Sequence, residues 1–175
     1  MIDIQVYGPD YGKVKPESVA EGLFRVAWSA LDVLGLHDKV KAKVDILVGT
    51  KRMEGKFLDT NIGGYCSAFE DTKSKEYEVD IELARLSDVE TMYLNLCHEI
   101  IHMKQFVLKE LGTNFQFLED EITITSAWKG KPWVAAKNQD GYFDSPWEKE
   151  AYEKEHWLYE RAIGNLTHNI NRRKR

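Results

Sequence analysis

The chain has 175 residues, of which 43% are hydrophobic and 30% are charged, and its formal net charge is −5. This balance is typical of one folded globular domain and excludes a disordered or fibrous chain. The negative net charge gives no general reason to expect a nucleic-acid partner, and no run of 18 apolar residues exists that would span a membrane.

The N-terminus and the cysteines indicate the cellular compartment in which we expect the protein. The N-terminus lacks the basic segment and long apolar run of a signal peptide. Cys66 and Cys97 are too few for a disulfide framework, so we expect buried thiols in a reducing cytoplasm. We interpret residues 1–170 as a single domain and residues 171–175 as a solvated basic tail rather than a nucleic-acid contact.

The first elements are a strand and a helix. Residues 2–6 alternate apolar with polar side chains, which predicts a short strand. Residues 16–36 have the spacing of a helix with one broad apolar face. Pro16 suits the first turn of this helix and Gly35 suits its end.

Two or three further strands follow. Residues 44–48 form a short apolar run that indicates a buried strand, and residues 49–62 are rich in glycine and polar residues, as in a loop. Residues 64–71 are compatible with another strand. In residues 76–83 every second side chain is apolar and the others are mostly acidic, which predicts one buried and one solvated sheet face.

A long helix is predicted next. Ser87 and Glu90 have the spacing of a capping box, with Ser87 as the N-cap. The apolar spacing continues to Leu111, and Gly112 is suited to the position just after the helix.

The last third predicts a hairpin and a final helix. Residues 122–135 carry apolar and aromatic side chains around a turn at Gly130. Ser145 and Pro146 then suit the start of a helix that Gly164 would close. The order of elements predicts an α+β fold.

His98 and His102 are the residues most indicative of chemistry. They are four positions apart in the long predicted helix, so both side chains project from one face, one turn apart. This spacing lets two imidazoles bind one zinc ion, and Glu99 beside His98 can take a proton from a water that zinc activates. A chain of this composition contains the pattern by chance in roughly one case in a hundred.

A catalytic zinc site needs a third protein ligand. The residues just after His102 include no further histidine, so the third ligand is expected on the final helix. Glu148 lies on the apolar, core-facing side of that helix, whereas Glu150 points nearly opposite. A carboxylate on an apolar face is costly unless it is paired or bound to a metal, so Glu148 is the predicted ligand. Glu150 is the first alternative and His156 the second.

Residues 98–102 and 146–151 together resemble the gluzincin type of zinc peptidase. The likeness is strongest to small metallopeptidases of phage and bacterial genomes and more distant to the ImmA/IrrE family. In those families a later helix bearing Glu-x-x-Ala supplies the third ligand, and Glu148 matches that register. The resemblance implies a minimal zincin-like fold with a small mixed sheet, a long active-site helix and a C-terminal helix carrying the third ligand. It also implies a zinc-dependent metalloendopeptidase acting on peptides or proteins.

The predicted roles follow from these positions. Glu99 is the expected general base, and it would later return its proton to the leaving amine. Tyr152 lies one turn beyond Glu148 on the same face, so its hydroxyl is a candidate to stabilise the oxyanion, and His156 is another. A packed tyrosine and a solvated histidine are the respective alternatives.

The sequence signals for residues that would contact a substrate are less specific than those for the metal ligands. Residues 63–69 are the candidate strand for pairing with an extended peptide, because their glycines permit close backbone approach; an ordinary edge strand or loop is the alternative. Trp128, Trp133 and Trp147 are expected to line a pocket or to belong to the core.

Two other functions compete with the peptidase: a non-catalytic zincin-fold binding or phage structural protein, and a zinc hydrolase of a non-peptide amide or ester. An intact Glu99 favours catalysis.

Overall fold

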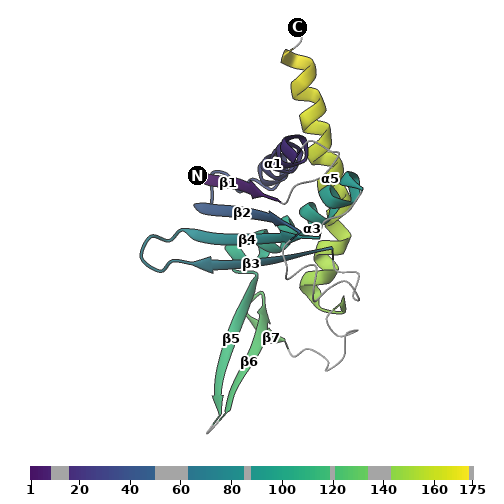
Figure 1. The fold of residues 1–175 in the computed structure, drawn as a ribbon. Helices are drawn as coiled ribbons and strands as arrows, with labels where there is room; N and C mark the ends of the chain where they lie inside the picture. The colour runs from purple at the N-terminus through teal and green to yellow at the C-terminus, as the bar shows by residue number, and fades with distance from the viewer. Residues whose placement is uncertain (9–15, 50–62, 85–87, 119–120, 134–142, 174–175) are drawn as a thin grey trace.

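The computed structural model describes residues 1–8, 16–49, 63–84, 88–118, 121–133 and 143–173. Within these residues the chain has an α+β fold with three helices and two sheets (Figure 1), as the element order predicted. The loop predicted at 49–62 lies outside the described residues apart from Gly49.

The larger sheet has four strands in the order β1-β2-β4-β3. Strands β1 (Ile2–Tyr7), β2 (Ala42–Val48) and β4 (Tyr77–Leu83) run parallel to one another, and β3 (Gly64–Glu70) pairs antiparallel with β4. Among the described strands, β3 therefore has a partner along one edge only. This edge position is the one that an added peptide strand would require.

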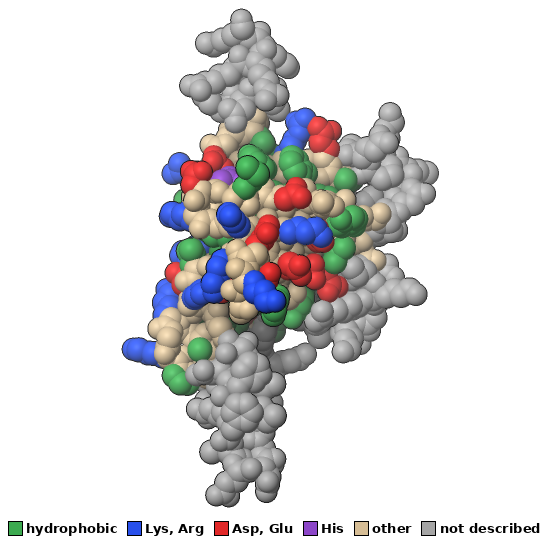
Figure 2. Space-filling view, turned by 90° about the vertical axis from the view of Figure 1, so that its left-hand side faces the viewer, with side chains coloured by type: hydrophobic (Ala, Val, Ile, Leu, Met, Phe, Trp, Pro, Cys, Tyr) green, Lys and Arg blue, Asp and Glu red, His purple; other side chains and the backbone are tan. Residues whose placement is uncertain are grey.

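One face of this sheet is buried and the other is largely solvated. In β4, Val79 and Ile81 are buried, whereas Glu78 and Asp80 are exposed, so the alternation predicted for this segment is confirmed. Glu82 departs from the pattern because it is buried. On the face seen in Figure 2, described basic and acidic side chains are interspersed.

Two helices cover the buried face, and a third packs on them. Helices α1 (Pro16–Val33) and α3 (Val89–Val107) pack on the sheet and on each other, and α5 (Pro146–Arg173) packs against both (Figure 1). Ser29 Oγ of α1 donates a hydrogen bond of 2.9 Å to the carbonyl of Ala162 of α5 within the core. No helix in the described part of the chain is long and apolar enough to cross a membrane.

Helix α3 starts and ends differently from the prediction. Its N-cap is Asp88, not Ser87, because the Asp88 carboxylate accepts from the backbone N–H groups of Glu90 and Thr91, at 3.2 Å each. Ser87 itself lies outside the described residues.

The C-terminus of α3 lies at Val107, four residues before the predicted end. Lys109 adopts a left-handed conformation with φ of 59°, and the N–H of Glu110 bonds the carbonyl of Gln105 at 2.7 Å. This arrangement closes a helix with the geometry that glycine usually provides. Gly112, which we predicted to end the helix, lies in the following strand instead.

The last helix continues past its predicted end. Gly164 does not have positive φ, and α5 runs through it to Arg173, so the predicted end of the helix at Gly164 is wrong. A glycine inside a helix costs only about 1 kcal/mol relative to alanine. The Gly35 prediction is confirmed, because this residue has φ of 64° just after α1.

The second sheet has three strands, β5 (Leu111–Leu118), β6 (Glu121–Trp128) and β7 (Lys131–Trp133). The predicted hairpin corresponds to β6 and β7, joined by Lys129 and Gly130, both with positive φ. Strand β5 was not predicted, because its first residues had been assigned to the preceding helix. Figure 1 shows this sheet extending away from the main body on the side of β3.

Candidate metal centre

Two helices bring the predicted ligands together. His98 and His102 lie one turn apart in α3, which is held in place by buried neighbours such as Ile100 and Ile101. Glu148 lies in the first turn of α5, where its backbone N–H is 3.4 Å from the hydroxyl of Ser145. Its carboxylate reaches the histidines instead of closing a capping box.

The three side chains form a compact trio. The Nε2 atoms of His98 and His102 are 3.1 Å apart. Glu148 Oε2 lies 3.3 Å from His98 Nε2, and Oε1 lies 3.2 Å from His102 Nε2. All three residues are buried, with exposed fractions of 9%, 6% and 2% for His98, His102 and Glu148. The structure therefore gathers the residues proposed as ligands in a shielded position.

The Nδ1 atoms of both histidines face away from the trio, and their hydrogen bonds determine which ring nitrogens carry a hydrogen. His98 Nδ1 is 2.7 Å from Glu155 Oε2, and His102 Nδ1 is 2.9 Å from Gln105 Oε1. Because both of these oxygens are acceptors, each Nδ1 carries a hydrogen. The lone pairs of both Nε2 atoms then point at each other and at the Glu148 carboxylate. Such a convergence is favourable only around positive charge, either a proton or a metal ion.

The spacing fits a metal ion. Zinc–nitrogen and zinc–oxygen bonds of about 2.05 Å at a tetrahedral angle give ligand atoms that are roughly 3.3 Å apart. The three observed separations, from 3.1 to 3.3 Å, are close to that edge length. The buried trio of His98, His102 and Glu148 could thus hold a metal ion with little rearrangement.

The electrostatics of the centre favour a cation. Burial lowers the pKa of His98, but hydrogen bonds with Glu148 and Glu155 outweigh this effect and raise it to about 9. The pKa of His102 is also raised, because bonding to Glu148 outweighs burial. The acidic groups that stabilise protonated histidine would equally stabilise a divalent ion in its place.

Glu99 lies beside the trio, held against strand β3. Only 4% of the residue is exposed. Burial raises the pKa of its carboxyl to about 7, although the neighbouring charges of His102 and His98 act in the opposite direction. A carboxyl with this pKa can both accept and return a proton near neutral pH.

Gly64 makes the position of Glu99 possible. A Cβ atom at Gly64 would lie 2.6 Å from Glu99 Oε1 and 2.7 Å from its Cγ, which is closer than van der Waals contact allows. The predicted strand 63–69 therefore does pass close to the site, and it needs glycine at this point.

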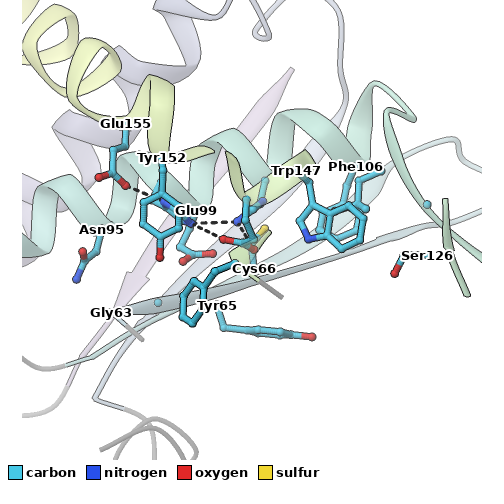
Figure 3. Close-up of a pocket in the computed structure, with 17 residues that line it drawn as sticks. Gly63, Tyr65, Cys66, Asn95, Glu99, Phe106, Ser126, Trp147, Tyr152 and Glu155 are labelled. Atoms are coloured by element: carbon cyan, nitrogen blue, oxygen red, sulfur yellow. Dashed lines mark hydrogen bonds and ion pairs between the residues drawn. The ribbon is translucent and has the colours of Figure 1, made fainter. Parts of the chain in front are cut away.

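A cavity of about 380 Å³ opens onto the centre (Figure 3). Tyr152, one turn after Glu148, lines it and packs edge-on against His98 with ring centroids 4.6 Å apart. Trp147 and Phe106 also line the cavity, and in Figure 3 they lie on the side away from Tyr152 and Glu155. The cavity is lined by Glu99 and by all three residues of the trio.

The remaining tryptophans and the cysteines have structural surroundings. Trp133 and Trp128 pack around Trp147, with ring centroids 4.7 and 6.4 Å away, and so attach the small sheet to the start of α5. Cys97 is buried, as predicted, and burial raises the pKa of its thiol to about 12. Cys66 lines the cavity, and burial also raises its pKa.

Neither alternative third ligand lies in the trio. The Glu150 carboxylate faces away, where Gln105 Nε2 donates to it at 3.0 Å and Lys104 lies 3.6 Å away. His156 is largely exposed and faces Glu155 at 3.8 Å. Of the three candidates on the final helix, the structure places only Glu148 next to both histidines.

Comparison with known proteins assigns no family. Neither a protein-family model nor a curated protein matches the chain.

Gln105 and Glu155 are the site residues that the sequence analysis missed. Each holds the Nδ1 atom of one histidine. A sequence signal existed for Glu155, because it is two helical turns after Glu148 and so shares its face. Gln105 gave a weaker signal, as a polar residue about one turn beyond His102 that is followed by the apolar Phe106 and Val107.

Proposed function

We propose that this protein is a zinc-dependent hydrolase of peptide bonds, with His98, His102 and Glu148 as metal ligands and Glu99 as the general base. The observation that carries the proposal is the convergence of two imidazole Nε2 atoms and one carboxylate, 3.1 to 3.3 Å apart, beside a buried glutamate. Three protein ligands next to a cavity are typical of catalytic zinc sites, whereas structural sites are closed by four.

When bound, zinc would lower the pKa of a water to about 7 and polarise the carbonyl of the scissile bond. The carboxylate of Glu99 then takes the proton of the attacking water and delivers it to the leaving amine. The phenol of Tyr152, packed on His98 at the cavity, donates a hydrogen bond to the carbonyl oxygen as negative charge develops there. Glu155 and Gln105 keep the two imidazoles in orientation.

The arrangement around the site supports a peptide as substrate. Among the strands that the structure describes, β3 lies at an edge of the sheet, and its residues 64–66 line the cavity together with the preceding Gly63. An extended peptide paired with β3 would pass its carbonyl groups close to Glu99. We accordingly propose a zincin-like fold, in line with the resemblance to small phage and bacterial gluzincins.

A digest of a broad peptide library tests this function. Cleavage that stops on addition of a chelator and returns with zinc supports the proposal. If zinc-loaded protein cleaves no peptide, the peptidase assignment is wrong. Hydrolysis of a panel of non-peptide amides and esters would then indicate the other hydrolase class, and no hydrolysis at all would indicate a non-catalytic metal site.

A further inference from the structure

Gln105 is a buried amide that contacts both helices of the metal centre. Its exposed fraction is 0%. Its Oε1 lies 2.9 Å from Nδ1 of His102, on its own helix α3. Its Nε2 lies 3.0 Å from the backbone carbonyl of Trp147 and 3.0 Å from Oε2 of Glu150, both on α5. Every polar atom of this side chain is therefore engaged within the site.

The chemistry of these partners determines the orientation of the amide. The Trp147 carbonyl can only accept a hydrogen bond, and the Glu150 carboxylate, which is paired with Lys154, also accepts. Both amide hydrogens of Gln105 must therefore point at α5. Rotating the amide by half a turn would set its oxygen against two other acceptors, at a large cost in a buried position.

Because Nε2 of Gln105 donates both of its hydrogens to α5, Oε1 faces His102. An amide oxygen only accepts, so His102 Nδ1 must carry a hydrogen, and in the neutral imidazole Nε2 then carries the lone pair. That Nε2 is the atom directed at His98 and Glu148. The orientation of one amide thus selects the histidine tautomer that can bind a metal.

We propose that Gln105 is a positioning residue that holds His102 in its metal-binding tautomer and ties the first turn of α5 to α3. This role rests on the proposed metal site. Trp147 directly precedes Glu148, so the bond from Gln105 to its carbonyl sets the separation between the histidines and the third ligand. His98 is held differently, by the charged Glu155, so the two histidines have separate supports.

Two substitutions test the two functions of the amide, which are to accept a hydrogen bond from His102 and to donate hydrogen bonds to α5. Gln105→Met removes both the acceptor for His102 and the donors to α5 at similar length. Gln105→Glu keeps an acceptor for His102 but replaces the donors with negative charge facing Glu150 and a carbonyl. Gln5 is exposed on β1, so Gln5→Met controls for replacing a glutamine by a methionine. Ile101 is buried in α3, so Ile101→Val controls for a small loss of core packing.

The test measures zinc affinity by competition with a chromophoric chelator, and the imidazole ¹⁵N–¹H spectrum of the full chain. We expect Gln105→Met to weaken zinc binding by roughly 10 to 100-fold, as loss of a hydrogen bond behind a ligating histidine does elsewhere. Gln105→Glu should also weaken it, whereas Gln5→Met and Ile101→Val should stay within about twofold.

The spectrum of the parent protein provides a result that does not depend on any variant folding. Zinc-loaded parent should show His102 protonated at Nδ1, and Gln105→Met should show loss of that single tautomer. A parent with His102 protonated at Nε2, or a Gln105→Met variant with parental affinity and tautomer, would overturn the proposal, as would a parent that binds no zinc. A parent that binds zinc as expected but hydrolyses no peptide would overturn the proposed function and leave the role of Gln105 intact.

Discussion

A single methyl group at Gly64 tests whether catalysis depends on the position of Glu99. In Gly64→Ala the new Cβ would lie 2.6 Å from Oε1, 2.7 Å from Cγ and 3.0 Å from Cδ of Glu99. Carbon atoms in contact lie about 3.5 to 4.0 Å apart, so the Glu99 side chain must shift by roughly 1 Å at Cγ. Glu99 is only 4% exposed, although it lines the cavity, so the shift either moves its carboxylate within the cavity or displaces its neighbours.

The expected magnitude follows from that shift. A misplacement of about 1 Å in a reacting group can cost roughly 100-fold in rate, so we expect kcat to fall by about that factor. Overpacking of this kind costs about 1 to 3 kcal/mol of unfolding free energy, which corresponds to a decrease in Tm of roughly 2 to 12 °C. The affinity for zinc should change little, because the side chains that a Cβ at Gly64 would meet are not the proposed ligands.

Gly112→Ala is the matched control. Gly112 lines the same cavity, and a Cβ there would meet no atom within 4 Å. The assay compares kcat on a peptide selected from the library digest, zinc content and Tm for the parent and both variants. Equal turnover of the two variants would refute the argument that Gly64 positions Glu99 for catalysis.

Three further predictions concern the same site. Glu99→Gln should keep zinc and lose about 10²- to 10⁴-fold in kcat, because an amide cannot take the proton; activity within tenfold of the parent would remove this role. Tyr152→Phe should lower kcat by up to about 10²- to 10³-fold at unchanged zinc content, and unaltered turnover would show that the hydroxyl takes no part. Burial raises the pKa of Cys97 to about 12 and also raises that of Cys66, so at pH 8 both thiols are protonated. Neither should react with a thiol reagent in the native protein, although both should react after unfolding; rapid labelling of folded protein would contradict this.

The site could be predicted in part from the sequence because helical periodicity determines which side chains share a face. His98 and His102 are one turn apart in any helix, and the contrast between Glu148 and Glu150 also follows from their angular separation. The structure brings Glu148 to the histidines and directs Glu150 away. Such predictions depend on one helix at a time and need no knowledge of how helices pack.

The supporting contacts could not be predicted in the same way. Gln105 acts through atoms of Trp147 and Glu150 more than 40 positions away, and their meeting depends on how α5 crosses α3. No local pattern encodes that crossing. The buried amide is explained only once both helices are in place.

The helix ends were missed for a different reason. Glycine is predicted to mark a helix end at three positions, and this prediction is correct at Gly35, which has positive φ. At the end of α3 a lysine, Lys109, adopts the left-handed conformation instead, and at Gly164 the helix simply continues. Glycine lowers the cost of a left-handed residue but neither requires that conformation nor is required for it. The early end of α3 is also what frees the residues after Lys109 to form β5.

The central claim is that His98, His102 and Glu148 bind one metal ion. Zinc per chain, measured by elemental mass spectrometry in protein purified without added metal, tests it most directly when Glu148→Ala and Glu153→Ala are measured in parallel. Glu153 is exposed on the same helix and serves as the matched control. We predict about one zinc per chain in the parent and in Glu153→Ala, and clearly less in Glu148→Ala. A parent that holds no zinc, even after reconstitution, would contradict the metal centre and the proposed hydrolase with it.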